Sequence, residues 1–290
     1  MSNTIELFKQ YIAELDYVYK HDSATAKLDM SGTLVQQGAN ANELIIPKIS
    51  MDGLADYSRA SGYVSGDVAL TMETVQYNYD RGRAFTVDAM DDLETVQLAF
   101  GRLAGELVRT KAVPELDAFR FAKYAGTSGI SSTEAALTTG QGIIDALVAA
   151  QSAMDEDEVP FEDRHLFITP TLLNKAEAVA LTANKNVLTQ FASVNKVAQT
   201  RFYTAIDLKD GTTENELVGG YAKASGGKDI NFMIIHRPSL LQYSKHVVNK
   251  IITPELNQTA DGWKFFYRAY GLADVYENKV AGIYMHNAAS

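Results

Sequence analysis

The sequence predicts an α+β fold, because it contains both long helical patterns and long strand patterns. Apolar side chains from Leu93 to Leu107 step by three or four residues, which is one face of a helix. From Trp263 to Glu277, apolar and polar side chains alternate, as in a strand with one buried face. The 290 residues, 46% of them hydrophobic, are enough for a large core in one or two domains.

Composition excludes several classes of protein. The formal net charge is −10, whereas a protein that grips nucleic acid through its phosphates needs a basic surface. The absence of cysteine excludes disulfides and thiolate metal sites, and it suits a reducing cytoplasm. No apolar run approaches the roughly 20 residues that span a bilayer. The first residues lack the basic and apolar regions of an export signal.

Residues 1–43 predict an N-terminal arm and a linker. Ile5, Phe8 and Ile12 belong to a stripe at helical spacing, so we expect a short amphipathic helix here. Such a helix needs a partner surface for its stripe, and this is either its own domain or a neighbouring subunit. Residues 22–43 are polar and irregular, which is typical of a linker or loop.

Residues 44–90 predict a long β-hairpin. Pro47 confines the outgoing strand to an edge position, because proline cannot donate to a strand ladder. The return strand begins at Val68, and its alternation slips phase between Met72 and Val75, which predicts a bulge.

The tip of this hairpin, residues 51–67, is polar and contains three glycines. A two-stranded hairpin is marginally stable by itself in water, so we expect another chain to stabilise it. The candidate contacts at the tip are Leu54, Tyr57 and Tyr63.

A long helix follows the hairpin. Asp91 and Glu94 fit a capping box at its start, and Gly126 marks its end. Pro114 interrupts the helical pattern and predicts a kink or a restart.

The second half of the chain mixes helices and strands. We expect a helix at 141–154 with Ile143, Ile144, Leu147 and Val148 buried. A strand at 166–169 leads into a helix that begins at Pro170, with Thr169 as its cap. The remaining predicted strands are 232–235, 240–252 and 263–277.

No motif in the chain predicts catalysis, a cofactor or a bound metal. Gly140 and Gly142 begin a dinucleotide-like pattern, but Asp145 stands where the third glycine is needed. The five histidines are scattered, and no pair has the spacing of a zinc hydrolase motif. We therefore expect a protein that is not an enzyme.

The order of parts, together with local sequence, resembles the Hong Kong 97-type major capsid proteins of tailed bacteriophages. Ile46–Leu54 looks like the outgoing limb of the extended loop of such proteins, and Tyr79–Phe85 with Asp88–Asp91 looks like its return. Arg109–Ala118 looks like the spine helix of the peripheral domain, and Leu166–Pro170 like a strand–helix junction of the axial domain. The likeness covers nearly the whole chain.

The resemblance implies a division of the chain into an arm with its linker, an extended loop, a peripheral domain that holds the spine helix, and an axial domain. The corresponding residues are 1–43 for the arm and linker, 44–90 for the loop, 91–132 with 236–277 for the peripheral domain, and 133–235 with 278–290 for the axial domain.

The resemblance also implies a function, which is to assemble into hexamers and pentamers that form an icosahedral phage head around double-stranded DNA. Expected partners are other copies of the chain, a separate scaffolding protein, a portal protein, and packaged DNA without sequence-specific binding. Expected subunit contacts are Ile5, Phe8, Ile12, Leu54, Tyr57 and Tyr63. The expected location is the virion, after assembly in the host cytoplasm and away from membranes.

Two alternatives stay open at this stage. An encapsulin-like nanocompartment uses the same fold to enclose a protein cargo. A soluble enzyme of unknown type is the alternative from a different class.

Overall fold

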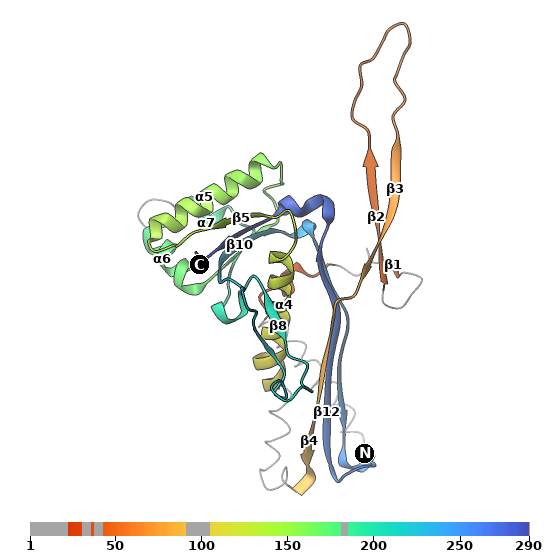
Figure 1. Ribbon diagram of the computed structural model, residues 1–290, viewed down its shortest axis with the longest axis vertical. Helices are drawn as coiled ribbons and strands as arrows, with labels where there is room; N and C mark the ends of the chain where they lie inside the picture. Colours follow the sequence, from red (N-terminus) through yellow and green to blue (C-terminus); the bar gives the residue numbers. More distant parts are fainter. Residues whose placement is uncertain (1–22, 31–35, 38–42, 91–104, 181–184, 290) are drawn as a thin grey trace.

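The computed structural model describes residues 23–30, 36–37, 43–90, 105–180 and 185–289. Figure 1 shows a body in which helices cover a mixed sheet, beside a long three-stranded sheet. A two-stranded hairpin projects from the top of this assembly along its longest axis.

The described helical segments are the π-helical turn η3 (Val108–Ala112), α4 (Val113–Ala125), α5 (Gly140–Glu156), α6 (Pro170–Ala180) and α7 (Lys185–Thr189). The helices α4, α5 and α6 agree with the predicted ones in order and place, whereas α7 was not predicted. Short 3-10 helices are η1 (Ala26–Leu28), η4 (Gln199–Arg201), η5 (Arg237–Ser239), η6 (Pro254–Leu256) and η7 (Glu277–Gly282).

The strands of the described residues form four sheets. They are β1 (Gln36–Gln37), β2 (Glu43–Met51), β3 (Val68–Gln76), β4 (Tyr79–Asp88), β5 (Ser131–Glu134), β6 (Arg164–Ile168), β7 (Ser193–Lys196), β8 (Ile206–Leu208), β9 (Tyr221–Lys223), β10 (Ile230–His236), β11 (Leu240–Ile252), β12 (Gly262–Val275) and β13 (Ile283–Asn287). The predicted strands 232–235, 240–252 and 263–277 are confirmed as β10, β11 and β12.

The centre of the body is the five-stranded sheet β5-β13-β10-β6-β7. Phe232 and Ile234 of β10 face the cluster that includes α5 and α6, while Met233 and Ile235 face the cluster that includes α4. Because both faces are covered, β10 is apolar along nearly its whole length instead of alternating.

Helix α5 begins where the sequence predicts it. Thr139 caps it by accepting a hydrogen bond from the backbone N–H of Gly142. A side chain at Gly140 would collide with the backbone of Lys175 in α6, so this glycine allows close helix packing. Val148 was predicted to be buried, and this is wrong: it is exposed, because Leu147 and Ala150 carry the inward stripe.

The three-stranded sheet β11-β12-β4 carries α4 on one face. Phe265 and Tyr267 of β12 are buried in the cluster that includes Val113 and Leu116, whereas Arg268 is exposed. The alternation read from the sequence is therefore confirmed, and these aromatic rings belong to the core.

Pro114 does not end the helix. Among the described residues, the chain passes from η3 directly into α4, and Leu107, Ala112 and Val113 all have right-handed helical backbone angles. Proline lacks an N–H and cannot donate a hydrogen bond within the helix, and the π-helical turn η3 lies directly before it, where the regular α-helical pattern is interrupted. The change from π to α geometry takes the place of the predicted restart. The predicted start of the helix at Asp91 lies outside the described residues.

The hairpin is shorter than predicted. Its ladder pairs Glu43 with Gln76 and Met51 with Val68, while β4 pairs with β12 in the other sheet. The predicted bulge between Met72 and Val75 is wrong, because the register of β2 and β3 is regular.

The slip in the apolar pattern of β3 marks a change of face. Val75 and Leu44 pack towards the body with Leu241 and Leu272, while Met72 points to the opposite face and is exposed. Alternate residues of a strand lie on opposite faces, so an apolar pattern changes phase when the covered face changes. On its other side, β2 pairs with β1 through Leu44 and Ile45. The residues that would lie opposite Pro47 are outside the described part of the chain, so the edge position predicted there stays a prediction.

Candidate subunit-contact surfaces

The outer part of the hairpin carries an unpartnered apolar face. Cross-strand partners share a face, and the register pairs Ile49 with Leu70 and Met51 with Val68. These four side chains and that of Met72, here called the hairpin stripe, are 57–71% exposed. Ser50 and Ala69 lie on the other face. Exposed apolar residues gathered on one face mark a contact surface more strongly than isolated ones do.

The tip residues proposed from the sequence are also exposed. Leu54 is fully exposed at 107%, Tyr63 is 90% exposed, and Tyr57 is 60% exposed. The rings of Tyr57 and Tyr63 make an edge-to-face pair with centroids 4.9 Å apart. Whether they contact another chain stays a prediction. The other candidates, Ile5, Phe8 and Ile12, lie outside the described residues.

The hairpin stripe was missed in the sequence analysis, although a signal for it was present. Val68, Leu70 and Met72 alternate with Ala69 and Thr71, which is the pattern of a strand with one apolar face. The phase change towards Val75 was assigned to a bulge, so the alternation was not recognised as a separate outer surface.

A buried network of hydrogen bonds, here called the polar clasp, joins the segment Ser23–Met30 to Asp117 and Arg120 of α4. This segment was predicted to be part of a linker or loop. Asp117 of α4, which has no exposed surface, accepts hydrogen bonds from the hydroxyls of Ser23 and Thr25 at 2.8 and 2.7 Å. It also accepts from the backbone N–H of Ala24 at 3.0 Å, and Arg201 lies 3.4 Å from it. The segment is irregular apart from the short turn η1, as expected for a loop, and its polar side chains are hydrogen-bonded inside the protein.

A second half of the clasp is built around Arg120, which is 1% exposed. Its guanidinium donates to Thr25 at 2.9 Å and to the carboxylate of Asp29 at 3.0 Å. Gln242 donates to the same carboxylate and accepts from Tyr124, so α4 and β11 hold the segment together. Buried charges that are paired and hydrogen-bonded in this way are strongly destabilising to break.

A basic groove lies between η3, β4 and the loop that joins β8 to β9. Its volume is about 1000 Å³. Arg81 forms the floor: it donates to the carboxylate of Glu115 at 2.7 Å and to the backbone oxygen of Lys209 at 2.7 Å. The hydroxyl of Tyr79 lies 3.4 Å from Glu115, and burial raises the pKa of this tyrosine well above its ordinary value.

Arg83 holds the β8–β9 loop against the groove. It donates to the backbone oxygens of Leu217 and Val218 at 2.9 and 3.2 Å. Gly211 and Gly219 have positive φ angles, and a side chain at either would crowd the guanidinium of Arg83. The loop is therefore shaped around an arginine and presents exposed Leu217 and Val218 in a fixed position.

Three histidines lie in the strands of the five-stranded sheet. Burial lowers the pKa values of His165, His236 and His286 below the ordinary value. The Nδ1 atom of His165 is hydrogen-bonded to the hydroxyl of Ser193, and that of His236 to the hydroxyl of Ser239. Within the described part of the chain, no three metal-ligating side chains gather in one place. The same part holds no helix long and apolar enough to cross a membrane.

Comparisons with known proteins identify the architecture. No family model and no curated protein matches the chain. Among solved structures, one from Gordonia phage Cozz matches with a TM-score of 0.62 and 12% identity, covering 93% of this chain and 87% of that one. The virus-like particle from Pyrococcus furiosus matches with a TM-score of 0.59 and 12% identity, covering 97% and 99%.

The capsid structure of the cyanophage P-SCSP1u matches over 88% of this chain and 86% of that one, with a TM-score of 0.56 and 12% identity. At such identities the likeness is one of fold. This chain therefore has the α+β fold of the Hong Kong 97-type phage capsid proteins, as its sequence predicted.

Proposed function

We propose that this chain is a major capsid protein, which assembles into hexamers and pentamers and closes into a shell around double-stranded DNA. The observation that carries the proposal is the hairpin stripe, an apolar surface on a projecting element of a capsid fold. An apolar strand face that its own chain leaves in water is stabilised when a neighbouring subunit covers it. A shell repeats that contact in every subunit.

The proposed partners follow from this role. They are other copies of the chain, a scaffolding protein, a portal protein, and packaged DNA held without sequence-specific contacts. The net charge of −10 supports the last point, because an acidic wall does not adhere to the DNA that it encloses. The proposed location is the virion, after assembly in the host cytoplasm, and the proposed role includes no catalysis and no bound cofactor.

The direct test is to express the chain alone and with its candidate scaffolding protein and to examine the products by electron microscopy and light scattering. Closed shells or open sheets of capsomers are expected. Particles no larger than a dimer under both conditions would contradict the proposal. Elemental analysis of purified particles checks the absence of a stoichiometric metal.

The hairpin provides a sharper test within the same assay. Replacing residues 52–66 by a short Gly-Ser turn should leave the melting transition of free subunits nearly unchanged, because loop closure depends weakly on length. The same change should abolish shells. Normal assembly of this variant would show that the tip is not a subunit contact.

A second candidate function is an encapsulin-like nanocompartment, which the match to a virus-like particle over nearly all of both chains favours. The contents of purified particles separate the two candidates. Nuclease-protected DNA is expected for a phage head, and a single enriched cargo protein is expected for a nanocompartment.

A further inference from the structure

The segment Ser23–Met30 is attached to the five-stranded sheet as well as to α4. Leu28 has no exposed surface and packs in the same cluster as Phe167 of β6. The ammonium group of Lys27 donates to the side-chain oxygen of Asn195 in β7 at 3.2 Å. The segment is therefore held from two sides, by the polar clasp and by contacts that reach β6 and β7.

A hydrogen-bond relay runs from this attachment to a histidine. The side-chain oxygen of Asn195 faces Lys27, so its amide nitrogen is turned to Ser193 and donates to the hydroxyl at 2.8 Å. The same hydroxyl lies 2.8 Å from Nδ1 of His165 in β6, the strand beside β7. The hydroxyl proton of Ser193 then has Nδ1 as its acceptor, so neutral His165 carries its own proton on Nε2. The neutral ring therefore completes the relay.

The ring of His165 lies among more cations than anions. The charged and titratable groups that face it come from its own loop, from η1, from η5 and from β10, and they are Asp163, Lys27, Arg237 and His236. Burial, Arg237 and Lys27 lower the pKa of the ring, and Asp163 opposes them. The Nε2 atom is buried and has no hydrogen-bond partner among the described residues. A proton added to this ring is therefore placed where positive charge is disfavoured.

Arg237 joins the same region to the segment by a second contact. Its guanidinium donates to the backbone oxygen of Asp29 at 3.0 Å. A positive charge on His165 repels the cations of both attachments, Lys27 and Arg237. Protonation also turns Nδ1 into a donor, so the hydroxyl proton of Ser193 loses its acceptor. Both effects weaken the hold of the sheet on the segment.

We propose that His165 is an acid-sensitive switch that loosens the segment Ser23–Met30 from the five-stranded sheet. With the ring neutral, the relay and both cationic contacts hold the segment. With the ring charged, the segment opens locally while the sheet stays folded. Because residues 1–22 join the body through this segment, the switch sets whether their point of attachment is held or free. It acts in the isolated subunit and does not depend on the proposed function.

Acid is expected to open the segment, and the size of the effect follows from linkage. A histidine whose pKa lies below the ordinary 6.5 in the closed segment stabilises the closed form above pH 6.5. This stabilisation is lost as the pH falls towards the depressed value. Each unit of depression changes the ratio of closed to open segment by about tenfold.

Hydrogen–deuterium exchange of the full-length free subunit, followed by mass spectrometry, measures the opening. Protection factors for residues 24–30 and for β10 are compared at about pH 8 and about pH 5.5, after correction for intrinsic exchange rates. The protection of residues 24–30 should fall by about tenfold for each unit of depression, while β10 stays protected. Equal protection at both pH values would overturn the switch. Loss of protection in β10 to the same degree would also overturn it, because the whole subunit would then be unfolding.

His165→Gln removes the titration and keeps a side chain that can hydrogen-bond to Ser193. The protection of residues 24–30 should then differ by less than about twofold between the two pH values. An acid response as large as that of the wild type would assign the response to another group and refute the proposal.

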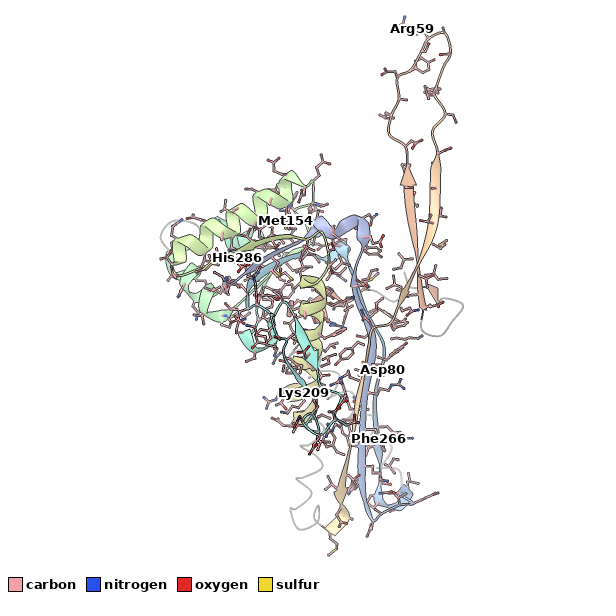
Figure 2. The ribbon with its side chains drawn as sticks, viewed as in Figure 1. Arg59, Asp80, Met154, Lys209, Phe266 and His286 are labelled. Carbon is pink, nitrogen blue, oxygen red and sulfur yellow. The ribbon has the colours of Figure 1, made fainter. Side chains whose placement is uncertain are left out.

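The matched control is His286→Gln. Figure 2 shows His286 within the body, and its ring stacks on Phe232 with centroids 5.0 Å apart, on the sheet face turned away from Leu28. Burial lowers the pKa of His286 as well, yet its replacement should leave the acid response of residues 24–30 unchanged. A response that is abolished here and kept in His165→Gln would overturn the assignment to His165.

Lys27→Gln gives a test that does not touch the core, because Lys27 is exposed. Glutamine keeps a donor for Asn195 and removes the charge that faces His165. The pH midpoint of the opening should rise by about 0.2–0.5 unit, since one of the cations that depress the pKa of the ring is gone. A midpoint that stays or falls would contradict the repulsion on which the proposal stands.

Discussion

Strands β10 and β3 are both rich in apolar residues, yet their surroundings are opposite. In β10, Phe232 and Met233 point to opposite faces and both are fully buried, because helices cover each side of the sheet. In β3, Val68 and Leu70 are more than half exposed, on a face that no residue in the described part of the chain covers. The difference teaches that a strand of similar composition can serve the core of the fold or stay exposed at its surface, where we propose a contact with another chain.

The comparison predicts a separation of effects. Substitutions in the body should change the stability of the free subunit, whereas substitutions in the hairpin stripe should change assembly alone. Four changes test this separation, from the largest expected effect on subunit stability to the smallest.

Phe121→Ala should have the largest effect. This side chain of α4 has no exposed surface, and its ring lies 5.3 and 4.8 Å from the rings of Phe167 and Phe202. Removing it leaves a cavity at the centre of the body, and we expect a loss of about 3–5 kcal/mol in the free energy of unfolding. Denaturant unfolding of the free subunit measures it. A loss below about 1 kcal/mol would show that the body repacks around the gap.

Asp117→Ala should come next. The substitution leaves the hydroxyls of Ser23 and Thr25 without their shared acceptor in a buried site, and it deprives Arg201 of its ion partner. We expect a loss of about 3 kcal/mol in the free energy of unfolding, together with faster proteolysis of the segment Ser23–Met30. The control is Glu106→Ala, which removes an exposed ion pair with Arg109 and should change stability by less than about 0.5 kcal/mol.

Acidification should weaken the body and spare the hairpin, which contains no histidine. Burial holds the pKa values of His165, His236 and His286 below the ordinary 6.5 in the folded protein. The unfolded chain therefore binds more protons, and stability that is complete above pH 6.5 is lost as the pH falls towards the depressed pKa values. Melting temperatures measured from pH 8 to pH 5 should fall below pH 6.5. A flat profile across that window would contradict the assignment.

Leu70→Ser should have the smallest effect on the subunit. The side chain is 57% exposed in the isolated chain, so we expect a change in the free energy of unfolding within about 0.5 kcal/mol. Assembly, measured by light scattering, should fail or need a much higher protein concentration, because the serine places a hydroxyl in a covered apolar contact. Normal assembly would remove the hairpin stripe from the subunit contacts. Thr71→Ser, on the opposite face of β3, is the matched control.

The sequence by itself determined the elements and their class. The continuous apolar run of β10, the alternation of β12 and the start of α6 at Pro170 are local patterns, and each predicted its element. These patterns are readable because the spacing of side chains is fixed by the period of a helix or strand. The order of elements and the local likeness then predicted the fold that the solved structures share.

Only the tertiary structure decided which polar residues are buried and which apolar residues are left in water. Asp117 and Arg120 look like ordinary charges on a helix, and partners about 90 residues away in sequence make them a clasp. The phase change in β3 looked like a bulge, because nothing local shows that Leu241 and Leu272 cover one face at the base of the hairpin. The basic groove likewise joins four distant stretches of chain. Burial depends on which segments meet, and sequence spacing carries no information about that.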